Sequence, residues 1–322
     1  MAAEHARRLG GDLAEVHFSL GNVYQVTGKA EEAIAEERRG LELAPDSDEG
    51  YRQIGSAYLV LGRKEEAVQA YLKAIEINPY YWFSFNLLGE AWFQMGDYNK
   101  ALSAFARVTE LEPDNVYGYE NVGAIYTSEA KWSESIQAFQ KALRLDPDFV
   151  AYSNLGTAYF YLSRYEEAAK MFEKAAQMNP NEQVVLGNLA DAYRWSGQAK
   201  KALATYDRAI ALAYEELQVN PRQAITLQSL ALYYAKKGDR GQALEFIHNA
   251  RSIDPNNVQI IYGEGVVQAL VGQPQEALRA LREAFQRGYP PEEASVDPEL
   301  RNLRTRPDFQ QLMNVARSRK KS

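Results

Sequence analysis

The sequence predicts an all-α chain of about eight antiparallel helix pairs, followed by short helices that cap its C-terminal end. Three observations carry this prediction. Small residues recur about every 34 residues, and prolines recur where each second helix would end. Within each period, apolar residues follow helical spacing. A fixed period of this length is typical of stacked supersecondary units, so we divide the 322 residues into repeats and not into globular domains.

Small residues mark the period at one position of each first helix. They are Gly21, Gly55, Gly89, Gly123, Gly156, Ala190, Ala231 and Gly265. The first three intervals are 34 residues each, and one later interval is 41. Eight repeats therefore occupy 14–47, 48–81, 82–115, 116–148, 149–182, 183–223, 224–257 and 258–291.

Each repeat reads as two helices with a break between them. In 48–81, Gly62-Arg63 separates two runs of helically spaced apolar residues, and Pro79 follows the second run. Proline lacks the backbone N–H and clashes with the preceding turn, so it does not continue a helix. Seven of the 12 prolines occupy this closing position: Pro45, Pro79, Pro113, Pro147, Pro180, Pro221 and Pro255.

The two ends of the chain depart from the period. Residues 1–13 read as an N-terminal partial helix or cap, in which Ala2–Leu9 resembles the end of a second helix. Residues 292–322 are expected to form C-terminal capping helices, around Pro298–Leu303 and Asp308–Ala316, and a basic tail. Glu37 replaces an aromatic residue in the first repeat, which we interpret as the polar outer face of a terminal repeat.

The sixth repeat has a longer second helix, by seven residues between Ala209 and Pro221. Seven residues turn a helix by about 700°, so its stacking face keeps its phase. We expect the added turns to project from the stack, either as a neutral insertion or as a ledge for an intramolecular or partner contact.

Residue types within the repeats carry a family resemblance. Large aromatic residues follow three positions after the small residues, as in Tyr58 and Trp92, and we expect these rings to fill the space that the small residues leave. A second-helix alanine precedes a ring by four positions, as in Ala67 and Tyr71. The pattern Leu-Gly-x-x-Tyr, Ala, Phe or Tyr, Ala, Pro resembles the tetratricopeptide repeat (TPR). The resemblance implies an α-α superhelix, a TPR solenoid, in which the first helices line the concave face.

A narrower resemblance concerns the order of the irregular segments. The run from Tyr80 to Phe93, the lengthened repeat and the tail from Gly288 to Phe309 are similar to C-terminal TPR regions of multidomain bacterial signalling proteins. In those proteins the array follows a serine/threonine kinase, a cyclase or a DNA-binding effector domain. This chain contains no kinase motif.

Composition excludes several classes of function. The net charge of -7 includes no basic block apart from the tail at Arg317, Arg319, Lys320 and Lys321, which argues against nucleic-acid binding. The absence of cysteine removes disulfides, thiol nucleophiles and Cys-based metal sites. No apolar run is long enough to span a membrane. We therefore expect a cytoplasmic protein without a nucleic-acid or membrane partner.

A search for catalytic motifs predicts no enzyme, cofactor or metal site. His5, His17 and His248 lie in different parts of the chain without metal-ligand spacing. A phosphate-binding loop, a dinucleotide fingerprint and a Gly-x-Ser-x-Gly elbow are all missing from the sequence.

The remaining candidate site is the groove that the resemblance implies. Counting inward positions along the first helices gives the groove residues Phe83, Asn86, Phe93, Tyr117, Asn121, Asn154, Tyr161, Asn188, Arg194 and Trp195. Asn121, Asn154 and Asn188 share one repeat position, and an amide both donates and accepts, so such a ladder suits an extended peptide backbone. Asparagine is also common at this position in the repeat family, which leaves open the alternative that these residues belong to the repeat pattern and have no role in binding.

The sequence therefore predicts a non-catalytic scaffold that binds a peptide or helix of a protein partner in the groove. The alternative is a regulatory C-terminal TPR region of a larger bacterial signalling protein, such as a serine/threonine kinase.

Overall fold

The computed structural model describes residues 13–319, and within that range the regular structure is entirely helical. The partial helix or cap expected at 1–13 therefore lies outside the described residues except for Leu13, and so do Lys320 and Lys321 of the tail. The helices alternate as first and second members of pairs, as the period predicts, and the fold class is confirmed.

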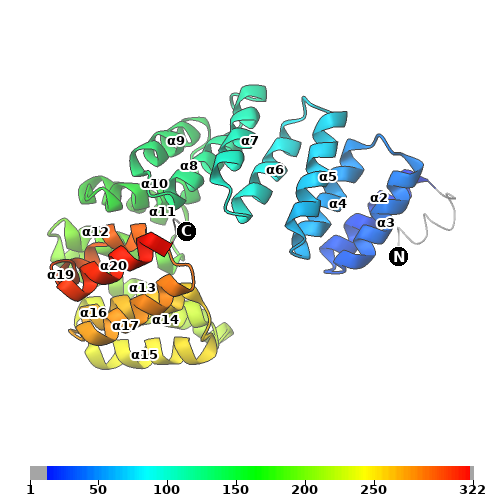
Figure 1. Ribbon diagram of the computed structural model, residues 1–322. Helices are drawn as coiled ribbons and strands as arrows, with labels where there is room; N and C mark the ends of the chain where they lie inside the picture. Colours follow the sequence, from blue (N-terminus) through cyan, green and yellow to red (C-terminus); the bar gives the residue numbers. More distant parts are fainter. Residues whose placement is uncertain (1–12, 320–322) are drawn as a thin grey trace. The chain divides into compact units, whose positions relative to one another are not determined.

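The helices fall into two compact units. The first unit comprises 1–129 and 137–146, and Figure 1 shows its helix pairs following one another along the chain. Its helices are α2 (Ala14–Val26), α3 (Ala30–Leu43), α4 (Asp48–Val60), α5 (Lys64–Ile77), α6 (Trp82–Gln94), α7 (Tyr98–Leu111), α8 (Val116–Ser128) and most of α9 (Trp132–Leu145).

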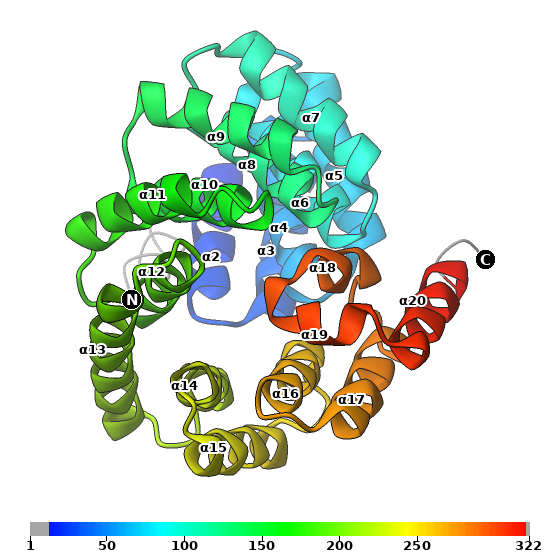
Figure 2. The same ribbon diagram turned by 90° about the vertical axis from the view of Figure 1, so that its left-hand side faces the viewer.

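The second unit comprises 130–136, the start of α9, and 147–322. Figure 2 shows α12, α14 and α16 on the inner side of an arc and α13, α15 and α17 on its outer side. Its helices are α10 (Phe149–Tyr161), α11 (Tyr165–Met178), α12 (Gln183–Trp195), α13 (Ala199–Val219), α14 (Ala224–Lys237), α15 (Arg240–Ile253), α16 (Val258–Leu270), α17 (Pro274–Gln286), α18 (Pro291–Val296), the 3-10 helix η1 (Pro298–Leu300), α19 (Arg301–Arg304) and α20 (Pro307–Arg319).

The small residues of the period lie where two paired helices cross. A methyl group added at Gly55 of α4 would lie 2.5 Å from a ring carbon of Tyr71 on α5, and Tyr71 has no exposed surface. Gly89 meets Phe105 in the same way, at 2.6 Å. The ring that fills the space therefore belongs to the second helix, and not to the first-helix aromatic residues that we expected to fill it.

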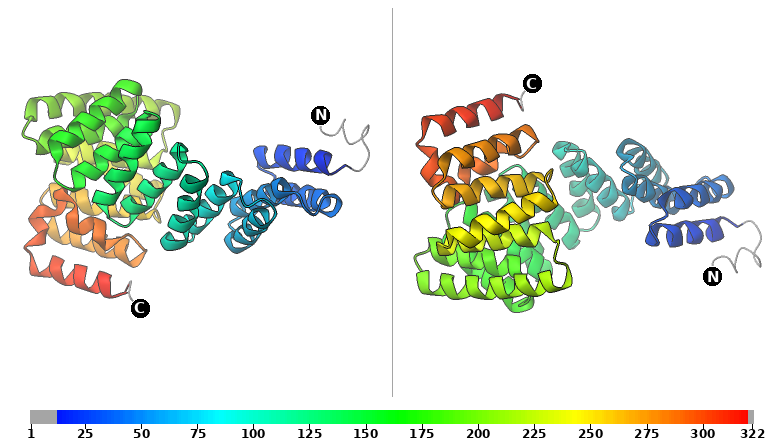
Figure 3. Two further views of the ribbon diagram at one scale, coloured as in Figure 1. Left: turned by 90° about the horizontal axis from the view of Figure 1, so that it is seen from above. Right: turned by 90° about the horizontal axis from the view of Figure 1, so that it is seen from below.

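The C-terminal helices close the last hydrophobic face, as predicted. Leu300, Leu303, Phe309 and Leu312 are buried together with Leu281 of α17 in one hydrophobic cluster. Figure 3 shows α20 lying alongside α17. The segment after the last repeat is thus part of the core of the second unit.

The structure contradicts our interpretation of Glu37 as part of a solvent-facing cap. Its side chain has no exposed surface, and neither carboxylate oxygen has a hydrogen-bond partner among residues 13–319. It occupies the place of Tyr71 in the next repeat, because a methyl group at Gly21 would lie 2.1 Å from Glu37 Oε1. Burial, and then the charge of Glu49, raises the pKa of Glu37 to about 9.

The long helix of the sixth repeat also differs from expectation. α13 has 21 residues where α11 and α15 have 14. Its added turns do not project freely: Ala213 is buried, Glu216 accepts a hydrogen bond of 2.9 Å from the Thr226 hydroxyl, and the Tyr214 ring packs edge-on against Phe246. The extension is packed against α14 and α15.

Candidate functional site

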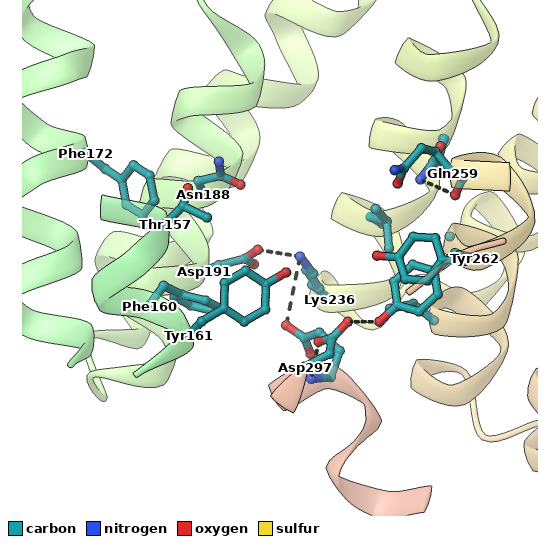
Figure 4. Close-up of a pocket in the computed structure, with 16 residues that line it drawn as sticks. Thr157, Phe160, Tyr161, Phe172, Asn188, Asp191, Lys236, Gln259, Tyr262 and Asp297 are labelled. Carbon is teal, nitrogen blue, oxygen red and sulfur yellow. Dashed lines mark hydrogen bonds and ion pairs between the residues drawn. The ribbon is translucent and has the colours of Figure 1, made fainter. Parts of the chain in front are cut away.

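A cavity of about 240 Å³ lies within the second unit, and the inner helices and the segment after α17 form its walls (Figure 4). α10 and α12 form one wall, α14 and α16 face them, and the C-terminal segment supplies three further side chains. The lining residues are Thr157, Phe160, Tyr161, Phe172, Asn188, Asp191, Gln228, Leu232, Lys236, Gln259, Tyr262, Gly263, Val266, Tyr289, Asp297 and Glu299.

Helical spacing explains why these residues share one cavity. On α14, Gln228, Leu232 and Lys236 are four residues apart, which places them on one face of the helix. On α12, Asn188 and Asp191 are three apart and share a face in the same way. The Lys236 ammonium and the Asp191 carboxylate meet across the cavity, 2.5 Å apart.

Glu299 enters the site from η1 and forms an ion-pair network. It accepts hydrogen bonds from the Arg194 guanidinium and, at 3.3 Å, from the Trp195 indole N–H, and its Oε1 lies 3.9 Å from Lys236 Nζ. The side chains of Glu299 and Lys236 are each only 7% exposed. Burial works to raise the pKa of Glu299, but Lys236 and Arg194 outweigh it, so the pKa lies below its ordinary value.

Asp297 is the second carboxylate of the C-terminal segment, and it is 8% exposed. It accepts hydrogen bonds from the Tyr262 hydroxyl at 2.6 Å and from the Glu299 backbone N–H at 2.9 Å. The Tyr262 ring stacks on Tyr289 with 3.9 Å between ring centroids. Burial raises the pKa of Asp297 to about 6.

Asp191 is fixed by two donors. The buried Tyr206 hydroxyl of α13 donates to its Oδ1, while Lys236 contacts Oδ2. Burial, and then the charge of Asp191, raises the pKa of Tyr206 well above its ordinary value, so the hydroxyl stays protonated and continues to donate. The acidic and basic groups of this cavity are therefore held in place by neighbouring helices.

The predicted groove residues of the second unit have different roles. Tyr161 and Asn188 line the cavity. Arg194 and Trp195 contact Glu299 and are thus engaged within the chain. Asn154 of α10 is half-buried and lies outside the lining.

The predicted groove residues of the first unit form a separate group. The Asn121 amide donates to the Asn86 side-chain oxygen at 2.9 Å, and Asn86, which is buried, donates to Glu90 at 2.6 Å. Phe83 contacts the Trp82 ring edge-on, with 5.4 Å between centroids. These amides are therefore paired with neighbouring side chains.

Two further aromatic contacts complete the group in the first unit. The Tyr117 ring, 62% exposed, stacks on Trp82 with 6.3 Å between centroids, and Phe93 packs against Tyr98 at 5.6 Å. Because Asn121 belongs to the first unit and Asn154 and Asn188 to the second, the asparagine ladder stays a prediction.

The predicted groove contained only two of the 16 residues that line the cavity, Tyr161 and Asn188. The same inward positions, counted in the last two repeats, give Gln228, Lys236, Gln259 and Tyr262, so the period contained a signal for them. Asp297 and Glu299 lie outside the repeats, and no periodic pattern points to them. Among residues 13–319, the acidic and histidine side chains form no group that could hold a metal ion. No described helix is long and apolar enough to cross a bilayer.

Comparisons with solved structures support the fold. The chain is similar to the crystal structure of the APC/C hetero-tetramer Cut9–Hcn1, with a TM-score of 0.60 and 19% sequence identity. That alignment covers 87% of this chain and 51% of the other chain. It also resembles the C-terminal part of a TPR repeat-containing protein from Cytophaga hutchinsonii, with a TM-score of 0.55, 20% identity and coverage of 76% and 98%. PilF of Pseudomonas aeruginosa aligns with a TM-score of 0.52, 21% identity and coverage of 66% and 94%.

Family models match along most of the chain, whereas no curated protein matches it. A model described as the A/B hydrolase-like N-terminal domain matches 223–322, a range whose described part is helical throughout. Models described as tetratricopeptide repeat or TPR repeat match 14–47, 49–81, 82–115, 123–163, 150–182 and 182–256. With the paired helices, these matches show that the chain belongs to the tetratricopeptide repeat family.

Proposed function

We propose that this TPR protein is a non-catalytic scaffold that holds a peptide segment of a protein partner in the cavity of the second unit. TPR repeats support an interaction scaffold in general. The observation that carries the proposal is the convergence of side-chain amides from three inner helices: Asn188 of α12, Gln228 of α14 and Gln259 of α16.

Amides suit a peptide backbone because each offers both a donor and an acceptor. The Gln228 Nε2 group donates to the backbone carbonyl of Gln259 at 3.3 Å. The Oε1 atom of Gln228 is buried without a partner among the described residues. A buried acceptor without a donor is costly, by about 1–3 kcal/mol. A peptide N–H that reached this oxygen would remove that cost.

The test is a selection of peptides from a random displayed library against the full chain, followed by titration calorimetry. The combined variant Asn188→Ala, Gln228→Ala and Gln259→Ala removes three amides at about 1 kcal/mol each, so binding should weaken about 100-fold. Gln177→Ala, on the exposed side of α11, is the matched control and should bind as the wild type does. Equal affinities for all three proteins would exclude the cavity as the site.

The absence of catalytic activity and of cofactors, and a cytoplasmic location, belong to the same proposal. The alternative, a regulatory TPR region of a larger signalling protein, is supported by the resemblance of the tail from Gly288 to Phe309. The reading frame upstream in the gene tests it: an in-frame kinase, cyclase or DNA-binding domain would favour the alternative.

A further inference from the structure

The charges around the cavity do not balance. Three carboxylates line it, those of Asp191, Asp297 and Glu299, and Lys236 is the cationic residue in the lining. Arg194 stands behind Glu299 as a second cation. Within this set of five side chains, three negative charges meet two positive ones, which leaves a surplus of one carboxylate. The Arg304 guanidinium also lies nearby, but it donates to the Asp297 backbone carbonyl, at 2.7 Å.

The surplus belongs to Asp297. Arg194 and Lys236 contact Glu299, and Lys236 also contacts Asp191. Among the described residues, Asp297 forms no ion pair; the Tyr262 hydroxyl and a backbone N–H are its donors. A nine-tenths buried carboxylate without a cation is costly, because burial removes water that would otherwise solvate the charge.

An acceptor in the same cavity lacks a donor. Gln228 Oε1 is buried and unpaired among residues 13–319. A carboxylate without an ion-pair partner and an amide oxygen without a donor favour a cationic group that donates several hydrogen bonds and accepts none, which describes the ammonium of lysine and the guanidinium of arginine.

The walls suit such a group as well. Phe160, Tyr161 and Tyr262 line the cavity with aromatic rings. Ring faces attract cations, and the attraction grows as the cation is desolvated. The surplus carboxylate, the unpaired acceptor and the aromatic walls are three separate features that favour the same ligand chemistry.

We infer that the cavity receives a cationic side chain, lysine or arginine, of the partner peptide, with its charge at Asp297. This inference rests on the proposed function, because it specifies which residue of a bound peptide enters the cavity. An acidic peptide is disfavoured, since its carboxylate would face Asp297 and Glu299.

The experiment uses the full chain and peptides selected from the random library. We expect lysine or arginine to be enriched at one peptide position. Replacing that residue with citrulline, for arginine, or norleucine, for lysine, should weaken binding to the wild-type protein at least tenfold. Asp297→Asn should weaken binding of the parent peptide to a similar degree. Asp308→Asn, which changes a more exposed carboxylate of α20, should leave the affinity unchanged.

The outcomes separate the two claims. Peptides that need the three amides but show no cationic preference would overturn the inference and leave the proposed function standing. Peptides whose affinity is unchanged in the triple amide variant would overturn the proposed function, and the inference with it. Because Asp297→Asn also removes a hydrogen-bond acceptor, its melting temperature is measured alongside, and the citrulline or norleucine comparison tests the inference on the unaltered protein.

Discussion

Replacing Glu37 with glutamine should make the first repeat more stable at neutral pH. Glu37 is fully buried on α3, its two oxygens lack partners among residues 13–319, and its pKa is raised to about 9. The equivalent positions of the next repeats hold the rings of Tyr71 and Phe105. The folded protein therefore keeps Glu37 protonated at neutral pH, while the unfolded chain ionises it.

The sign and size of the effect follow from proton linkage. Between the ordinary pKa of 4.5 and the raised value of about 9, folding takes up a proton, so stability falls as the pH rises. The loss is about 1.4 kcal/mol per pH unit, or about 3 kcal/mol at pH 7. Glu37→Gln removes this loss, and its advantage should vanish below pH 4.5, where both states are protonated.

Hydrogen exchange of the amides in α2 and α3 measures the local opening free energy directly. Between pH 6 and pH 8 the advantage of Glu37→Gln over the wild type should grow by about 3 kcal/mol. Glu32→Gln, on the exposed side of α3, is the control and should change nothing. A variant that is less stable than the wild type, or whose advantage does not depend on pH, would refute the assignment of a buried, neutral Glu37.

Three further substitutions test the packing. Ser163 has φ = 60° at a turn where most other repeats, such as those with Gly62 and Gly197, have glycine. Ser163→Gly should therefore raise the unfolding free energy by about 1 kcal/mol in urea titrations, and a loss would contradict the strain. Gly55→Ala should lower it by about 1–3 kcal/mol, because the new methyl group meets the Tyr71 ring at 2.5 Å; a neutral result would show that the ring yields. Glu299→Gln should lower the stability of the second unit by about 2 kcal/mol, because it leaves Arg194 and Lys236 without their shared carboxylate. The exposed control Glu166→Gln should be neutral, and equal melting temperatures for both variants would contradict the network.

The local periodicity of the sequence was sufficient to predict the fold. The spacing of Gly21, Gly55 and Gly89 and the closing prolines predicted the helix pairs, because each repeat packs on its neighbours with the same contacts. The helices after the last repeat were predicted as caps of the repeat array. Part of the cavity was also within reach, since Tyr161 and Asn188 occupy inward positions of the period.

The repeat period could not predict the contacts between residues far apart in the sequence. Glu299 reaches Arg194 across 105 residues of sequence, and Asp297 reaches Tyr262 across 35, outside the repeat register. Glu37 was misread because a polar residue in a terminal repeat usually faces solvent, whereas this one takes the place of a buried ring. The added turns of α13 were expected to project, and only their packing against α14 and α15 shows otherwise.

The central claim is that the inner cavity of the second unit holds a partner peptide. Photo-crosslinking tests it most directly: a selected peptide carries a benzophenone next to its cationic residue, and mass spectrometry identifies the attached residues of the full chain. We expect attachment to α10, α12, α14 or α16 and competition by the unlabelled peptide. Attachment to the outer helices α13, α15 or α17, or to the first unit, would contradict the claim.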